Sequence, residues 1–213
     1  MTELNKSLQP LGLETGLIIR KKKMAETSEL VKEILSGNTR AFENLIQEYR
    51  QLVSHIVFRM IPNPQDREDI CQEVFIKVYQ NLADFRFESK LSTWMAQIAY
   101  NLSINYLRQK KMISIEDLAV SEDQEVNLPA ESIQPDKSVE EKDISQRLKN
   151  EIDNLPLQFR AIVTLFHLDQ MSYDEIGKIL NLPEGTVKSY LFRARKLLKE
   201  RLLSKYQLED IWQ

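Results

Sequence analysis

The sequence predicts an all-α protein with two small helical domains, joined by a flexible acidic linker, the second containing a helix-turn-helix. Apolar residues recur in steps of three and four along most of the chain, which is the period of an amphipathic helix. Only 5 glycines and 7 prolines occur among 213 residues, a composition that disfavours turn-rich β folds. An acidic stretch that contains prolines and lacks aromatic residues separates the two halves.

The composition excludes several classes of protein. A single cysteine rules out an intramolecular disulfide framework and a cysteine-based zinc site, and two histidines are too few for a histidine-rich metal centre. No nucleophile–base set or glycine-rich phosphate loop is present, so the chain is not expected to be an enzyme or to need a cofactor. No apolar run reaches 18 residues, and Leu17–Ile19 precede the basic run Arg20–Lys23, the reverse of a signal peptide. We therefore expect a cytoplasmic protein.

The first domain is predicted to span residues 26–111. Residues 1–25 show no sustained periodicity and are expected to form a loose N-terminal arm, in which Met24 is a second candidate start. A short helix near 29–35 precedes a long amphipathic helix over 42–60. That helix ends at Ile61-Pro62-Asn63-Pro64, because proline lacks a donor and restricts the residue before it.

Two more helices complete this domain. The helix over 66–82 is expected to bury five apolar side chains: Cys71, Val74, Phe75, Val78 and Leu82. The helix over 91–110 carries its own apolar series: Leu91, Trp94, Met95, Ile98 and Leu102. His55, His167 and Cys71 are interpreted as packing residues.

Residues 112–142 are predicted to be a linker, and residues 143–213 a second domain. Between Ser114 and Gln146 there are ten acids and two bases, so the stretch is too polar to offset the entropy of ordering it. The second domain contains a helix ending at Leu155-Pro156, a helix around 159–166, and then two helices separated by a short turn.

The last two helices have the features of a helix-turn-helix. Ser172 and Glu175 have the spacing of a capping box, Gly177 permits a close approach, and Asn181-Leu182-Pro183 forms a short turn. The final helix has an inner apolar stripe of Val187, Leu191, Ala194 and Leu198. Its outer face of Lys188, Ser189, Arg193 and Lys196 suits phosphates and base edges, although an ordinary basic bundle helix is the alternative.

Local charge favours a nucleic-acid partner although the net charge is −3. The segment 183–205 has seven bases and two acids, and the segment 86–111 has five bases and one acid. Aromatic residues lie between these latter bases, and Asn101 and Asn105 share one helix face. Such a segment suits single-stranded nucleic acid, which needs stacking surfaces and phosphate neutralisation, although Phe85 and Trp94 are also candidates for the core.

The chain resembles the extracytoplasmic-function (group 4) sigma factors of the sigma-70 family. The run Asp66–Tyr79 is similar to the family signature D-x-E-D-x-x-Q-E-x-F. The motifs that continue the resemblance are Phe85-Arg86, Ser92-Thr93-Trp94, Ile98–Asn101, Leu155-Pro156, Ser172–Gly177, Gly185–Ser189 and Arg193–Arg195. The resemblance covers about residues 26–205 and implies a bacterial RNA polymerase initiation subunit with no catalysis of its own.

The resemblance also implies which residues bind which partner. Asp69, Gln72 and Glu73 would contact the β′ clamp helices of core RNA polymerase. The residues implied for the −10 strand are Arg86, Phe87, Lys90, Trp94, Asn101, Asn105 and Arg108, with a flipped base held by the loop around 87–91. The residues implied for the −35 duplex are Thr186, Lys188, Ser189, Tyr190, Arg193, Arg195 and Lys196. Members of this family commonly pair with an anti-sigma factor, which is often membrane-bound, so the resemblance implies such a partner here.

A conventional helix-turn-helix repressor or activator is the alternative. Such a protein binds duplex operator alone, usually as a two-fold dimer. An initiation factor binds core polymerase, including its β′ and β subunits, and needs no obligate homo-oligomer. The polar face around Glu73 and the aromatic–basic segment favour the initiation factor.

Overall fold

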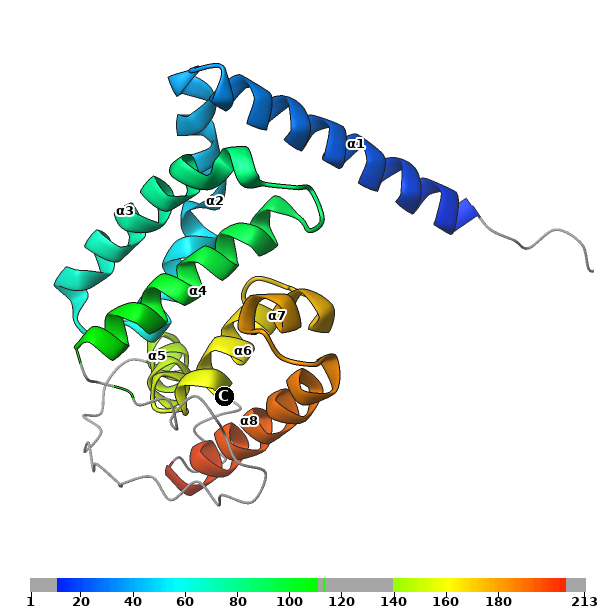
Figure 1. The fold of residues 1–213 in the computed structure, drawn as a ribbon. Coiled ribbons are helices and arrows are strands. Elements are labelled where there is room, and N and C mark those ends of the chain that lie inside the picture. The colour runs from blue at the N-terminus through cyan, green and yellow to red at the C-terminus, as the bar shows by residue number, and fades with distance from the viewer. Residues whose placement is uncertain (1–10, 111–112, 114–139, 206–213) are drawn as a thin grey trace, which may run out of the picture.

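The computed structural model describes residues 11–110, 113 and 140–205, which form two helical domains packed against each other (Figure 1). The first domain contains α1 (Leu11–Leu35), α2 (Thr39–Met60), α3 (Pro64–Asn81), the short 3₁₀ helix η1 (Leu82–Asp84) and α4 (Leu91–Gln109). The second contains α5 (Glu140–Asp153), α6 (Leu157–His167), α7 (Tyr173–Leu180) and α8 (Glu184–Lys205). No strand occurs within these described ranges, so the predicted all-α class is confirmed.

Helices α2, α3 and α4 pack around one apolar core. Its fully buried side chains come from all three helices and include Leu45, Val53, Val57, Val74, Val78 and Met95. Asn38 caps α2 by accepting a hydrogen bond from the Ala41 N–H. Asn63 caps α3 in the same way, and Pro64 starts the helix where its missing donor costs nothing. The sequence predicted that the helix ends after residue 60 at Ile61-Pro62-Asn63-Pro64, and this is correct. The break reverses the chain, so that α3 packs against α2.

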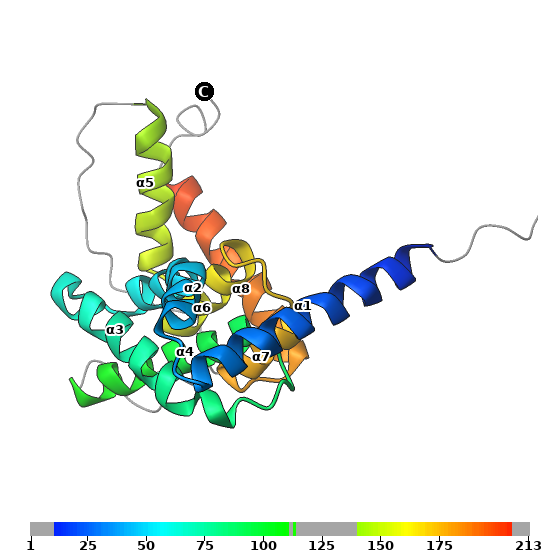
Figure 2. The same ribbon diagram turned by 90° about the horizontal axis from the view of Figure 1, so that it is seen from above.

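The prediction of a loose arm over residues 1–25 is wrong for residues 11–25. Helix α1 begins at Leu11, and its N-terminal half runs away from the body of the protein (Figures 1 and 2). Its C-terminal end contacts the domain, where Val31 and Ile34 are buried. The apolar residues of α1 form no single stripe, so periodicity could not reveal a helix that rests on the propensity of Leu, Glu, Lys, Met and Ala.

The second domain begins slightly earlier than the sequence predicted. Helix α5 starts at Glu140, before the expected boundary at 143, while residues 114–139 of the predicted linker lie outside the described residues. Helices α6, α7 and α8 form the core, in which Phe159, Ile162, Leu165, Ile176 and Ile179 are almost fully buried.

The helix-turn-helix forms as predicted. Ser172 accepts a hydrogen bond from the Glu175 N–H, and the Glu175 carboxylate accepts one from the Ser172 N–H at 2.9 Å. Asn181 ends α7 in the left-handed conformation with φ 55°, which asparagine tolerates well. A Cβ placed on Gly177 would lie 2.7 Å from the Leu182 carbonyl oxygen, so the tight turn depends on glycine here.

The two domains are docked together, an arrangement that no sequence pattern predicted. Helices α2 and α4 of the first domain contact α6 and α7 of the second (Figures 1 and 2). Several polar contacts cross this interface, among them three side-chain pairs: His55 Nδ1 lies 2.9 Å from Asp169 Oδ1, Arg59 donates to Asp153 at 2.6 Å, and Lys90 pairs with Glu175 at 2.8 Å.

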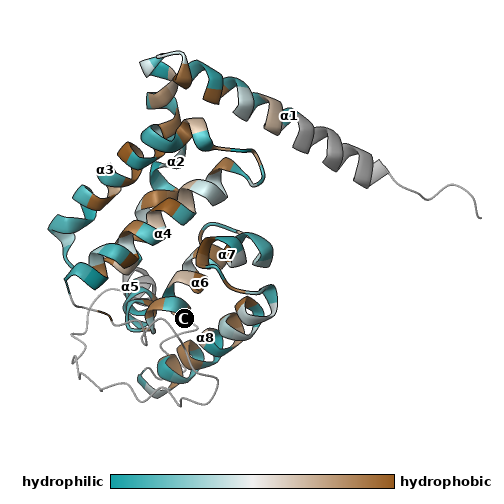
Figure 3. Ribbon diagram, in the orientation of Figure 1, coloured by the Kyte–Doolittle hydropathy of each residue, from teal (hydrophilic) through white to brown (hydrophobic). Residues whose placement is uncertain are grey.

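Hydrophilic and hydrophobic residues alternate along the helices (Figure 3). Within the described part of the chain, no helix is both long and apolar enough to cross a bilayer.

We predict that Gly177→Ala lowers the free energy of unfolding by about 1–3 kcal/mol, the usual range for overpacking. The added methyl group meets a backbone carbonyl rather than a flexible side chain, so the turn itself must shift. The matched control is Gly185→Ala in the first turn of α8, where nothing lies within 4 Å of the new Cβ. Urea denaturation followed by circular dichroism should show a loss for the first variant only. Equal stability of the two variants would contradict the tight turn.

Candidate nucleic-acid interface

The polar face of α3 projects into solvent as predicted. Asp69, Gln72 and Glu73 are all exposed, while Val74 and Val78 on the opposite side are buried. Two large apolar side chains, Ile76 and Tyr79, continue this face and are 55% and 52% exposed. An acidic patch that merges into exposed apolar residues is typical of a protein-docking surface rather than of a merely solvated helix face.

The loop before α4 is held in shape by its aromatic residues. The ring centroids of Phe85 and Phe87 are 4.7 Å apart, and those of Phe85 and Trp94 are 5.2 Å apart. Phe85 is buried, whereas Phe87 and Trp94 are only partly buried. Phe87 has a φ of 59°, which is uncommon for a bulky residue and is fixed here by the aromatic cluster.

Helix α4 presents a polar ridge beside that cluster. Asn101, Asn105 and Arg108 follow one another at helical spacing, and all three are exposed. Arg86 is also exposed and can reach a phosphate backbone, whereas Lys90, although exposed, is paired with Glu175 at 2.8 Å. Tyr100 is buried, and that burial, opposed only by the charge of Arg108, raises its pKa to about 12. Tyr100 is therefore not accessible for stacking on a nucleobase, whereas Phe87, Trp94 and Tyr106 are partly exposed.

The outer face of α8 presents several of the predicted duplex contacts. Lys188, Ser189 and Lys196 are exposed, and Thr186 and Arg193 are partly buried at one edge of the face. Lys188 forms an ion pair with Glu184 at 2.6 Å and lies over the Tyr173 ring. The Lys188 side chain is thus oriented by Tyr173 on α7 and Glu184 on α8.

Two of the predicted contacts lie elsewhere. Tyr190 is 8% exposed and packs edge-on against Phe159 at 5.6 Å, so it belongs to the core. Arg195 is exposed at the far edge of α8, where its Nε donates to His167 Nε2 at 3.2 Å and its guanidinium lies over the Phe166 ring. Burial and the charge of Arg195 lower the pKa of His167. We omit Tyr190 from the candidate interface.

Phe192 was missed by the sequence reasoning. It is 70% exposed, the most exposed large apolar side chain in the described part of the chain. It lies four residues from both Lys188 and Lys196, in the middle of the outer face of α8. That helical spacing was readable from the sequence, but the reasoning considered only polar side chains as base readers. An exposed phenylalanine in a major groove suits the methyl group of thymine.

Glu175 is the most strongly perturbed carboxylate near these surfaces. Burial raises its pKa, but hydrogen bonds from Lys90 and Ser172 and the charge of Lys90 outweigh that effect and bring it to about 2. The low pKa keeps this carboxylate, which lies between α4 and α7, ionised at neutral pH.

No group of His, Cys, Asp and Glu within the described ranges is arranged to hold a metal ion. Cys71 is partly buried, and desolvation raises its pKa, so the thiol is poorly reactive. His55 was expected to be a simple packing residue, but it forms the contact with Asp169 across the domain interface.

Comparison with known families gives two matches in chain order. The model for Sigma-70 region 2 matches residues 45–112, and the model for Sigma-70, region 4 matches residues 145–198. The first range contains α3 and α4, and the second contains the helix-turn-helix. The repressor alternative is set aside, because it does not account for a region 2 match.

Curated relatives match over nearly their whole length. The chain is 33% identical over 176 residues to the ECF RNA polymerase sigma factor SigW of Bacillus subtilis (strain 168), covering 81% of this chain and 94% of the relative. It is 32% identical over 177 residues to the ECF RNA polymerase sigma-E factor of Escherichia coli (strain K12), covering 81% and 92%.

Two solved structures share the fold. CnrH, solved in complex with the cytosolic domain of CnrY, aligns with a TM-score of 0.59 at 18% identity, covering 83% of this chain and 97% of that one. The sigma factor RpoE from Bartonella quintana, solved with the anti-sigma factor NepR, aligns with a TM-score of 0.55 at 21% identity, covering 77% and 99%. Both matched regions, the identity to the relatives and the shared fold agree: the chain belongs to the ECF sigma factors of RNA polymerase, and is a transcription initiation factor rather than an enzyme.

Proposed function

We propose that the chain binds core RNA polymerase through α3 and directs it to promoters by reading the −35 duplex with α8 and capturing the melted −10 strand with α4. The observation that carries this proposal is the family match over both domains, which brings three separate exposed faces into one role. Each face has the chemistry that its task needs.

The α3 face is suited to the polymerase. Asp69, Gln72 and Glu73 offer charge and hydrogen bonds, and Ile76 adds apolar area that is otherwise left in water. Acids would be unfavourable on a face that met DNA, because phosphates repel them. The partner of this face is therefore a protein, and we assign it to the β′ clamp helices.

The two faces assigned to DNA, on α4 and α8, differ in the form of DNA that each can bind. The α4 face has Asn101, Asn105 and the partly exposed Trp94, which suit unpaired bases that need edges and rings. The α8 face has Lys188, Ser189 and Phe192 on one helix of a helix-turn-helix, which suits a major groove. Strand capture and duplex reading are thus assigned to different domains.

We also propose that an anti-sigma factor holds the chain inactive and that the chain works in the bacterial cytoplasm. Both structures that share the fold were solved with a bound partner protein, and the partner of the Bartonella quintana protein is named an anti-sigma factor. The exposed Ile76, Tyr79 and Phe192 are apolar positions that such a partner could cover.

We predict that Glu73→Lys weakens binding to core RNA polymerase without unfolding the protein. Glu73 is exposed on α3, and surface substitutions usually change stability by about 0.5 kcal/mol or less. A pull-down with core enzyme should show at least a roughly tenfold loss, as expected for a charge reversal within an interface. The matched control is Glu43→Lys, the same change at an exposed position on α2. Wild-type affinity of Glu73→Lys would overturn the assignment of the α3 face.

We predict that Phe192→Ala weakens binding to the −35 duplex by about 1–2 kcal/mol, since it removes an apolar contact with a base methyl group. The measurement is holoenzyme binding to a promoter that the wild-type holoenzyme transcribes. Leu203→Ala is the matched control, because Leu203 is an exposed apolar residue near the end of the same helix. An equal effect of the two changes would contradict the assignment of Phe192 to the groove.

We predict that Asn101→Ala leaves duplex binding intact and impairs strand opening. Asn101 is exposed on α4 and lies in the domain assigned to the melted strand. Permanganate footprinting should show fewer reactive thymines in the −10 region at equal promoter occupancy. Gln109→Ala, at an exposed position in the last turn of α4, is the control. If Asn101→Ala opens the promoter as well as wild type does, the strand-capture role of α4 fails.

A further inference from the structure

The Glu175 carboxylate is bound from both domains at once. Its Oε2 accepts hydrogen bonds from the backbone N–H and the hydroxyl of Ser172, both at 2.9 Å, within the capping box of α7. Its Oε1 lies 2.8 Å from the Lys90 ammonium and 3.3 Å from the Thr93 hydroxyl, both in the first domain. One side chain therefore both starts the helix-turn-helix and ties it to the loop and helix assigned to the −10 strand.

From this geometry we propose that Glu175 is an interdomain lock. It holds the two domains of the free protein together, in a closed form, and lowers the affinity of the segment with the −10 contacts for DNA. The inference rests on the proposed function, because it treats Lys90 as a contact for the −10 strand. Closure itself is a separate property that can be measured without DNA.

Docking changes the charge that the −10 segment presents. In the closed form Lys90 is paired with Glu175 instead of being available to a phosphate. Docking also places the Glu175 carboxylate next to the N-terminal end of α4, and Gln97 on α4 donates to the Lys178 carbonyl at 3.0 Å. Asn101 and Asn105 stay exposed, so the lock lowers affinity through charge rather than by covering the whole segment.

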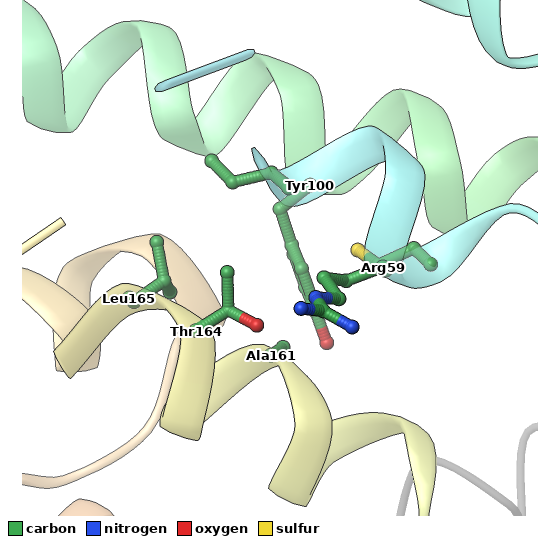
Figure 4. Close-up of a pocket in the computed structure, with 7 residues that line it drawn as sticks. Arg59, Tyr100, Ala161, Thr164 and Leu165 are labelled. Atoms are coloured by element: carbon green, nitrogen blue, oxygen red, sulfur yellow. The ribbon is translucent and has the colours of Figure 1, made fainter. Parts of the chain in front are cut away.

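The centre of the domain interface leaves no room for a water molecule. Tyr100 extends from α4 toward Ala161 and Thr164 on α6, with Arg59 alongside it (Figure 4). Among the described residues, the buried Thr164 hydroxyl and Asp169 Oδ2 have no hydrogen-bond partner. Buried polar atoms without a partner destabilise the docked arrangement, so the polar contacts at the rim of the interface matter more.

The lock also lies where solvent can weaken it. A cleft of about 220 Å³ between the domains is lined by Tyr49, Lys90, Asp169 and Glu175, among others. The Lys90 side chain is 68% exposed, whereas that of Glu175 is 13% exposed. Dissolved ions reach such a pair and screen it, so closure should weaken as salt concentration rises.

The closed form cannot place both DNA faces on one promoter. Elements centred near −35 and −10 lie about 25 base pairs apart, which is roughly 85 Å of B-form DNA. The two domains are in direct contact, so they must separate to reach both elements. The roughly 30 residues between Lys110 and Glu140 can extend to about 100 Å, which permits that separation.

The test compares Glu175→Gln with Asp174→Asn in the full chain. Glutamine still completes a capping box, so α7 is preserved while the pairing with Lys90 loses its charge. Asp174→Asn removes the same charge from the neighbouring position, where Asp174 pairs only with Lys178 on its own helix. His55→Ala is a second variant, which breaks the separate contact with Asp169 and leaves the capping box intact.

Interdomain distances are measured by pulsed electron resonance between spin labels at positions 77 and 199, both exposed, in a Cys71→Ser background. We expect Glu175→Gln and His55→Ala to raise the ratio of open to closed molecules roughly three- to tenfold, as for the loss of one partly solvated charged hydrogen bond, and Asp174→Asn to leave it unchanged. Binding of a labelled single-stranded 20-mer of mixed sequence should tighten in the two opened variants by a similar factor.

Unchanged distances in Glu175→Gln would overturn the lock, and so would an equal shift in Asp174→Asn. If the variants open but do not bind the single strand more tightly, the proposed loss of DNA affinity in the −10 segment is wrong, although the closed form still stands. A failed polymerase pull-down would instead contradict the proposed function, so the two failures are distinguishable.

Discussion

The docking of α7 against α4 is the contact on which the arrangement of the whole chain depends. The buried apolar residues of the two domains form one cluster, and the residues of Sigma-70 regions 2 and 4 fall on opposite sides of the contact. Ile56, Met60 and Leu165 lie at the centre of the contact, and polar pairs lie around them. The Lys90–Glu175 pair is the part of the interface that solvent can weaken, because the lysine side chain is mostly exposed.

The surfaces of the chain follow a simple division by charge. Acids lie on the α3 face assigned to a protein partner, and bases lie on α8 and around α4, which are assigned to DNA. The overall charge of −3 conceals this division, because the acidic stretch between the domains cancels the basic segments. Local charge therefore identified the partners of this protein better than the net charge did.

Local signals in the sequence were enough to predict most of the fold. The proline-flanked break after Met60, the apolar periods of α2 to α4 and the Ser172–Glu175 capping box are short-range features, and the structure contains all of them. Helix α1 was missed because propensity without a stripe leaves no periodic signal. The resemblance implied Tyr190 as a −35 contact, but Tyr190 lies on the buried side of α8, three residues after Val187 of the inner stripe, and Phe192 was overlooked because it is apolar.

The domain interface could not be predicted from the sequence for a different reason. The pairs His55–Asp169 and Lys90–Glu175 join residues that are 114 and 85 positions apart, and no spacing rule connects them. His55 was interpreted as a packing residue because the sequence shows only the helix on which it lies, not the residues that face it. Contacts of this kind depend on how two finished domains meet, and they become visible only in three dimensions.

Run-off transcription with purified core RNA polymerase tests the central claim most directly. Core enzyme alone should give no specific transcript from a linear library of bacterial upstream regions, and core enzyme with this chain should give discrete transcripts that share elements near −35 and −10. A chain that binds duplex DNA by itself as a two-fold dimer and adds no specific initiation to core polymerase would contradict the account.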